Sequence, residues 1–268
     1  MNYRKGYAVL RFCLLGSGSS GNALWVAAPD HAILIDNGLS FRQLKLRAAA
    51  AGESLDSLRA VFVTHEHGDH VNGVGTLARS HNLPVYMTAG TRENLPRIVG
   101  KLPCVEVFEG GEAIETGGMR VASFNVAHDA ADPVSYTVEA GGVKLGIAAD
   151  LGHASAVVRT KLCGSNALIL ESNHCPEMLR QGSYPPAIQQ RIRGWHGHMS
   201  NQEACSLLAK LAHDGLDIVV LVHISESNNS PNLAYAMARQ AVRHGSTEIH
   251  LATQDTPTPM FNLGRIPA

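Results

Sequence analysis

The sequence predicts an α/β fold in which mixed β-sheets are sandwiched between helices. Two observations point to this class. Short apolar runs alternate with amphipathic stretches along the chain, and the first strand-like runs follow one another without strict alternation with helices. Strict strand–helix–strand alternation is typical of a doubly wound parallel sheet, so its absence favours mixed sheets flanked by helices.

The predicted strands are short apolar or alternating runs with many β-branched residues. In order, they cover residues 9–15, 23–28, 32–36, 60–64, 84–87, 119–125, 135–139, 143–149, 167–170, 218–221 and 248–251. The most apolar of these runs should be buried. A polar residue at the end of such a run marks a place where the edge of a sheet opens into a cleft.

The predicted helices follow apolar residues spaced three and four apart. In order, they cover residues 40–51, 69–80, 92–99, 154–162, 186–193, 201–212 and 232–244. The helix at residue 201 has the clearest start, because Ser200 and Glu203 have the spacing of a capping box. Gly215 lies just beyond its end, where the chain is expected to reverse.

The charge balance gives no bulk electrostatic reason to expect nucleic acid or a membrane as partner. Lys and Arg number 22 against 23 Asp and Glu, a formal net charge of -1. A catalytic cleft in a neutral protein can still be locally basic. No apolar run approaches the roughly 18 residues of a membrane span. Residues 1–5 are basic, but Arg11 interrupts the apolar run that follows, so we interpret it as a first strand and not as a signal peptide.

The cysteines predict a reducing compartment. There are 5, they are scattered, and none forms a C-x-x-C pair. They are Cys13, Cys104, Cys163, Cys175 and Cys205. Buried, reduced thiols in a cytoplasmic protein are the expectation.

A histidine-rich turn after the apolar run 60–63 is the most informative motif. Residues two apart in an extended chain project to the same side, so His65 and His67 can converge on one ion. Gly68 permits a sharp turn, which redirects Asp69 and His70 toward a second point nearby. Four potential nitrogen and oxygen ligands within six residues suit zinc, manganese or iron. A histidine-rich surface turn is the alternative.

Further candidate ligands end later apolar runs. His128, Asp150 and His223 each terminate a run that should be buried. Singly, each is more often a turn residue than a ligand. Together with the histidine-rich turn, they complete two coordination shells.

This set of candidate ligands resembles that of the metallo-β-lactamase superfamily, from about residue 10 to the C-terminus. The resemblance implies a four-layer αββα sandwich of two mixed sheets flanked by helices, as a single domain over residues 1–268. It also implies two divalent transition-metal ions, zinc or manganese, with iron as an alternative. In the family, the residues that match His65, His67 and His128 hold one of the ions.

The second ion of the resemblance is held by the residues that match Asp69, His70 and His223, and the match to Asp150 bridges the two. Two such ions lower the pKa of a bound water and clamp the oxygens of a phosphodiester. The resemblance makes Asp69 a metal ligand. A second role, orienting the attacking water, is our hypothesis for this residue; the alternative is that Asp69 only binds metal.

The resemblance narrows to the YycJ (WalJ) branch, described as a bacterial DNA exonuclease and related to ribonuclease Z. The matching motifs lie at residues 18–22, 34–40, 128–130, 171–174, 197–201 and 223–231. The chain departs from the branch at Cys175, where Asp is usual, and at Asn37, where Cys is common. Neither departure is a metal ligand.

Glu171 and His198 are candidates for proton transfer. Glu171 ends an apolar run and His198 lies in a glycine-flanked loop. In the related phosphodiesterases a comparable pair assists proton transfer to the leaving oxygen, because a carboxylate fixes the tautomer of an imidazole and raises its basicity. A structural salt link beneath the site is the alternative. His174, His196 and His153 are weaker candidates.

Two other segments are candidates for contact with nucleic acid. The loop at residues 16–21 lacks the Gly-Lys-Ser/Thr of a P-loop, so we expect no nucleotide cofactor; a backbone nest for phosphate and a plain hairpin turn remain alternatives. Arg191 and Arg193 beside Trp195 have the residue types that meet phosphate and base, although a solvated helix face often carries such charges.

The sequence therefore predicts a metal-dependent hydrolase, a phosphodiesterase acting on nucleic acid and specifically a DNA exonuclease, with no membrane partner. DNA is expected before RNA as substrate. A small-molecule ester, thioester or lactam hydrolase is the alternative within the same centre, and carbonyl hydrolysis would not require Glu171 and His198. An iron-dependent sulfur dioxygenase and a non-catalytic scaffold are the remaining alternatives.

Overall fold

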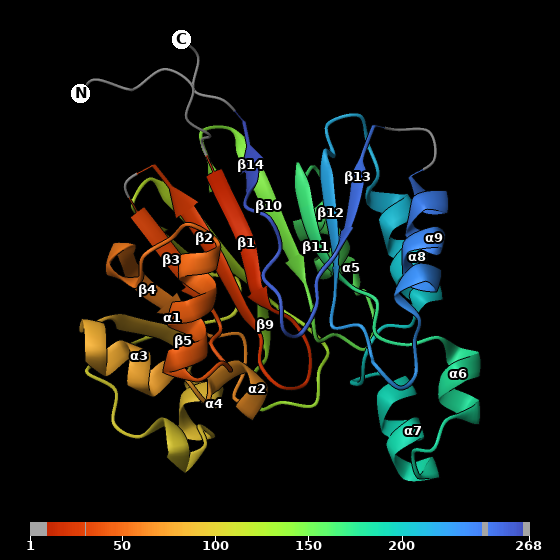
Figure 1. The fold of residues 1–268 in the computed structure, drawn as a ribbon, viewed down its shortest axis with the longest axis horizontal. Helices are drawn as coiled ribbons and strands as arrows, with labels where there is room; N and C mark the ends of the chain where they lie inside the picture. Colours follow the sequence, from red (N-terminus) through yellow and green to blue (C-terminus); the bar gives the residue numbers. More distant parts are fainter. Residues whose placement is uncertain (1–9, 30, 243–245, 265–268) are drawn as a thin grey trace.

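The computed structural model describes residues 10–29, 31–242 and 246–264, which form two facing β-sheets with helices on the outer sides (Figure 1). The first sheet has the strand order β14-β1-β2-β3-β4-β5-β6 and the second the order β13-β12-β11-β10-β9-β8-β7. Both sheets are mixed: β3 to β6 and β10 to β13 run parallel, and the remaining pairs are antiparallel. The predicted αββα sandwich is confirmed.

The elements have the following bounds. The first sheet contains β1 (Leu10–Gly16), β2 (Ala23–Ala28), β3 (His31–Ile35), β4 (Leu58–Phe62), β5 (Pro84–Thr88), β6 (Cys104–Phe108) and β14 (Phe261–Leu263). The second contains β7 (Ala113–Thr116), β8 (Met119–Asn125), β9 (Val134–Ala140), β10 (Val143–Ala148), β11 (Ala167–Glu171), β12 (Ile218–Val222) and β13 (Glu248–Leu251). The α-helices are α1 (Phe41–Ala50), α2 (Gly68–Val71), α3 (Val74–His81), α4 (Ala89–Glu93), α5 (Ala156–Leu162), α6 (Pro176–Gln181), α7 (Pro186–Arg193), α8 (Asn201–Leu211) and α9 (Pro231–Ala241). Two 3₁₀ turns are η1 (Leu55–Ser57) and η2 (Arg97–Val99).

Successive residues of the central strands face different layers, because side chains alternate along a strand. In β1, Phe12 packs between the two sheets, and Cys13 packs under the helices of the first sheet. In β12, Val220 packs between the sheets, and Val219 packs under α8 and α9. Burial on both faces explains why these strands appear in the sequence as continuous apolar runs.

Several element predictions need correction. The predicted helix 69–80 is two helices, α2 and α3, separated at Gly73. The predicted helix 92–99 is α4 followed by η2, because Pro96 has no N–H to continue a helix. Strands β6, β7 and β14 and helix α6 were not predicted. Residue 9 of the first predicted strand and residues 243–244 of the last predicted helix lie outside the described residues.

Helices α6 and α7 project beyond the ends of the strands, on the side of the molecule where α2 also lies (Figure 1). No side chain of α7 is buried. Among the described residues, no helix is long and apolar enough to cross a membrane.

Candidate metal centre

The candidate ligands gather where strands of both sheets end. Asp36 follows β3, Asp150 follows β10, and His223 follows β12. All three have left-handed backbone conformations, with φ of 59°, 52° and 54°. They are three of the four non-glycine residues with positive φ in the described part of the chain. This region is sparsely allowed for L-residues, and such strain is concentrated at functional sites.

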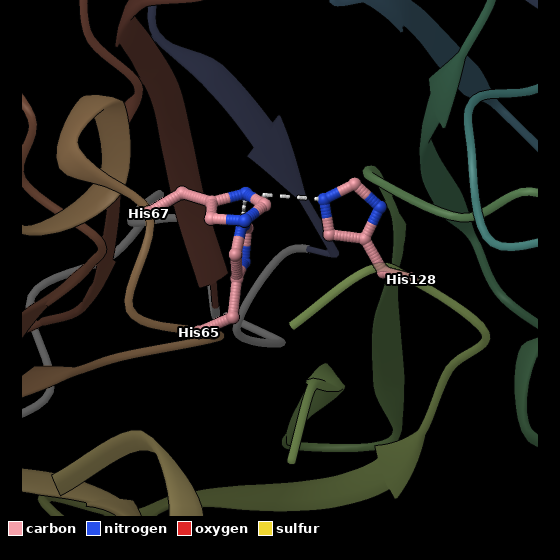
Figure 2. Close-up of side chains that lie close together, drawn as sticks. All are labelled: His65, His67 and His128. Atoms are coloured by element: carbon pink, nitrogen blue, oxygen red, sulfur yellow. Dashed lines mark hydrogen bonds between the residues drawn. The ribbon is translucent and has the colours of Figure 1, made fainter. Parts of the chain in front are cut away.

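The first cluster consists of His65, His67 and His128, which point toward one another from opposite sheets (Figure 2). His67 Nδ1 lies 3.0 Å from His65 Nε2 and 3.3 Å from His128 Nε2. Ligand atoms of the three residues all lie within 4.8 Å of one another. Three imidazole nitrogens at this spacing could hold one transition-metal ion, which accepts their lone pairs.

The outer nitrogens of two of these rings have partners of their own. His65 Nδ1 lies 2.9 Å from Thr64 Oγ1, and His128 Nδ1 lies 3.3 Å from the carbonyl oxygen of Gly197. Such contacts fix the tautomer and direct the inner nitrogen at a metal. Burial, then the neighbouring His70, holds the pKa of His65 well below its usual value, and burial also lowers the pKa of His128. Both rings are therefore neutral at physiological pH, as metal ligation requires.

The second cluster forms around Asp150. His70 Nε2 lies 3.2 Å from Asp150 Oδ2 and 3.4 Å from Asp69 Oδ2. Asn22 Nδ2 lies 3.0 Å from both Asp69 Oδ2 and His70 Nε2. His223 is buried, and its Nδ1 lies 2.8 Å from Asp150 Oδ1 and 3.4 Å from Glu171 Oε1. A buried imidazole nitrogen beside carboxylate oxygens fits the donor set of a second cation.

Buried charge in this cluster is paired. Burial by itself would raise the pKa of Asp150, but His223 and His70 hold it well below its usual value. Burial would likewise lower the pKa of both imidazoles, and Asp150 raises them well above the usual value. Asp150 is thus ionised at neutral pH, the form in which a carboxylate binds metal.

Asp36 supports this cluster, and the sequence analysis gave it no role. Its Oδ2 lies 2.8 Å from His70 Nδ1 and accepts a hydrogen bond of 2.7 Å from Thr64 Oγ1. Its Oδ1 accepts the Thr64 N–H at 2.8 Å. The carboxylate therefore orients the ring of His70. Its position at the end of an apolar run was the available signal, the same one that identified Asp150.

Glu171 and His198 form the predicted pair. His198 Nδ1 lies 2.7 Å from Glu171 Oε1, and the backbone N–H groups of Leu151 and Met199 donate to Glu171 Oε2 at 3.1 and 3.2 Å. Burial alone would raise the pKa of Glu171, but the charge of His198 and the hydrogen bond to it lower the pKa to about 2. Despite burial, Glu171 raises the pKa of His198. The ring is held by its Nδ1 and keeps 22% of its side-chain surface exposed.

The pair also adjoins the second cluster. Ligand atoms of Asp150, Glu171, His198 and His223 lie within 4.8 Å of one another. The predicted ligands of both clusters, together with Glu171 and His198, therefore lie next to one another where the strands of the two sheets end. The weaker candidates lie elsewhere: His174 and His196 belong to neither cluster, and His153 stacks on Trp195.

Other predicted features have local structural roles. In the loop 16–21, Ser17 Oγ accepts the N–H of His223 at 2.9 Å, so this loop positions His223. Cys175 is a partly buried free thiol at the start of α6. The prediction that the thiols are buried holds for Cys13 and is wrong for Cys104 and Cys163, which are exposed. Asn37 is fully buried, and its side-chain amide makes no hydrogen bond to the described residues.

Two clefts flank His198 and His223. The first has a volume of about 380 Å³ and exposes ligands of both clusters, including His67, His128 and Asp150, with Arg191 of α7 on its wall. The second has a volume of about 540 Å³. Its lining includes hydroxyl and carboxamide groups of Ser19, Tyr184, Ser225 and Gln254. An extended substrate could therefore run past the clusters on both sides.

Residues 31–224 match the model of the beta-lactamase superfamily domain. The chain is 35% identical to Exodeoxyribonuclease YycJ of Bacillus anthracis over 93% of this chain and 97% of that protein. It is 29% identical to Exodeoxyribonuclease WalJ of Streptococcus pneumoniae over 94% of this chain and 98% of that protein. Its fold is similar to that of Zn²⁺-bound PqqB from Methylobacterium extorquens, with a TM-score of 0.71, 17% identity, and 92% and 99% of the two chains covered.

Proposed function

The chain belongs to the metallo-β-lactamase superfamily and is a metal-dependent hydrolase, and from this premise we propose that it cleaves the phosphodiester bonds of nucleic acid as a DNA exonuclease. The observation that carries the proposal is the Glu171–His198 pair, which lies against Asp150 and His223. Expulsion of a nucleic-acid alkoxide needs a proton donor at this position, whereas expulsion of the thiolate of a thioester does not. The exodeoxyribonuclease names of two relatives support the same substrate class.

We propose that two divalent ions, zinc or manganese with iron as the alternative, occupy the two clusters. The proposed ligands are His65, His67 and His128 for the first ion, Asp69, His70 and His223 for the second, and Asp150 between them. Such ions lower the pKa of a water and stabilise negative charge on phosphodiester oxygens. The convergence of three imidazoles in one cluster, and of the carboxylate of Asp150 with the imidazoles of His70 and His223 in the other, both support the assignment.

Asp69 is proposed to orient the attacking water as well as to bind metal. Burial would raise its pKa, but the hydrogen bond to His70 outweighs burial and lowers it, so the carboxylate is an acceptor at neutral pH. Asn22 holds one of its oxygens at 3.0 Å. The side chain remains 23% exposed on the cleft, where a water can reach it.

His198 is proposed to protonate the leaving oxygen. Its Nδ1 is engaged by Glu171, so a proton on the opposite nitrogen, Nε2, is the one it can donate. As the phosphorus–oxygen bond breaks, the alkoxide takes this proton. The imidazole becomes neutral, and Glu171 keeps its orientation throughout. A positioned general acid contributes roughly 10²–10⁴-fold to such a step.

The proposed function is tested with metal-reconstituted protein and end-labelled single- and double-stranded DNA and RNA of one sequence. We expect chelator-sensitive release of nucleotides from an end of the DNA. His67→Ala should abolish release, and Arg120→Ala, a change of an exposed residue on β8 away from the clusters, should leave it unchanged. Efficient hydrolysis of a lactam or thioester with DNA and RNA left intact would replace the proposal with the small-molecule hydrolase.

A further inference from the structure

An exposed tryptophan lies beside the candidate metal centre. Trp195 follows α7 and is 66% exposed, whereas Trp25, the other tryptophan of the chain, is fully buried. The Trp195 ring packs against His153 at a tilt, with ring centroids 3.5 Å apart and an interplanar angle of 32°; we refer to this pair as the Trp195–His153 stack. The contact covers part of the indole, and the large exposed fraction leaves apolar surface open to solvent.

Chain connectivity keeps this stack close to the centre. His153 lies three residues after Asp150, and Trp195 lies three residues before His198. Three residues span at most about 10 Å, so the backbone of each residue lies within about that distance of a residue that lines the first cleft, Asp150 or His198.

Close backbone packing holds the two loops of the stack together. Gly152 approaches Trp195 so closely that a Cβ at this position would lie 2.2 Å from the Trp195 carbonyl oxygen. His153 Nδ1 lies 3.3 Å from the same oxygen, and His198 N–H donates to the Ile192 carbonyl oxygen at 2.9 Å. The two rings are therefore held together by the backbone of their loops before any ligand binds.

The helix that precedes Trp195 lines the first cleft with apolar and basic side chains. Ile188, Arg191 and Ile192 lie on one face of α7, at spacings of three and four, and all three line the first cleft. Arg191 contacts Asp129. Arg193 is exposed and has no hydrogen bond or ion pair with the residues that the structure describes. Arg193 lies two residues before Trp195, and an unpaired guanidinium and an exposed aromatic ring are complementary to the phosphate and base of a nucleotide.

We propose that the Trp195–His153 stack is a platform for an unpaired base of the nucleic acid whose phosphodiester lies in the first cleft, with Arg193 at a neighbouring phosphate. This inference rests on the proposed function and specifies its substrate as single-stranded or frayed nucleic acid. A base inside an intact duplex has both faces covered by its neighbours, so it cannot stack on Trp195.

Tryptophan emission tests the platform directly, because Trp25 is buried and contributes a constant background. Metal-loaded protein is titrated with a phosphorothioate oligonucleotide that resists cleavage, and with a relaxed, covalently closed circular duplex, which has neither ends nor unpaired loops. We expect the single strand to quench the emission and the closed duplex to leave it unchanged. Trp195→Leu should abolish quenching and weaken single-strand binding roughly 5- to 100-fold, the range of stacking on one aromatic side chain.

Matched variants distinguish the loss of base stacking from a loss of binding caused by misfolding. Trp195→Phe should retain most of the affinity, and Arg193→Ala should reduce the salt dependence of binding by about one counterion. Ile98→Ala, at a residue that is 69% exposed on η2, should leave binding unchanged.

Equal quenching by the closed duplex, or wild-type affinity in Trp195→Leu, would overturn the platform even if DNA is still cleaved. Quenching by the single strand without any cleavage would support the platform and contradict the nuclease proposal.

Discussion

At the scale of single residues, the candidate centre depends on the contact that each imidazole makes through the ring nitrogen that does not face the cluster. His70 is oriented by Asp36, His65 by Thr64, and His128 by the backbone of residue 197. The sequence predicts the imidazole ligands of the histidine-rich turn, because their spacing is a local pattern. It cannot predict that Asp36, at the end of another strand, contacts His70 Nδ1, because that contact depends on the pairing of β3 with β4.

His198→Ala should lower turnover on an oligonucleotide by roughly 10²–10⁴-fold, because the alkoxide then leaves without a proton donor. A nitrophenyl phosphodiester, whose leaving group needs no proton, should be affected much less. Elemental analysis should find the metal content of the variant unchanged. Loss of a metal ion, or equal losses on the two substrates, would show that His198 is a ligand and not a general acid.

At the scale of elements, the predictable part of the site is the set of strand ends. Asp150 and His223 are predicted because each ends a buried apolar run; His223 lies directly after β12, and Asp150 lies two residues after the end of β10. Their left-handed conformations could not be predicted, since nothing local marks a non-glycine residue for positive φ. Strand β6 was missed for a related reason: it is largely exposed at the edge of its sheet and lacks a continuous apolar run.

The capping box of α8 was predicted and is present, and it lies two residues after His198. Ser200→Ala should lower the free energy of unfolding by about 1 kcal/mol, since the N-cap hydroxyl is lost. Ser155→Ala removes a comparable N-cap from α5 and should cost a similar amount. Only Ser200→Ala should also reduce turnover, by up to about 100-fold, because Met199 next to it donates to Glu171.

Urea unfolding compares the stabilities of the two variants, and initial rates compare their turnover under conditions in which both variants are folded. Equal effects on turnover would mean that the start of α8 does not position the Glu171–His198 pair.

At the scale of the whole molecule, the two sheets each contribute part of the centre. The histidine-rich turn follows β4 of the first sheet, and the ligands from residue 128 onward follow strands of the second. Aromatic packing between the sheets holds them in register. Phe62 stacks on Tyr86 of its own sheet, with ring centroids 4.7 Å apart, and meets Tyr136 of the other sheet edge-on, with ring centroids 5.8 Å apart. The spacing of the clusters is therefore set by the sandwich, which a sequence pattern can indicate only as a fold class.

Counting the metal ions bound per chain tests the central claim most directly. Elemental analysis of protein reconstituted with zinc or manganese should give two ions per chain, because the two clusters have separate ligand sets. His67→Ala should remove about one of them, and Asp150→Ala should reduce the content further, because its carboxylate lies between the clusters. A protein that hydrolyses its substrate at full rate with no metal, or that binds a single ion with all these residues intact, would contradict the account.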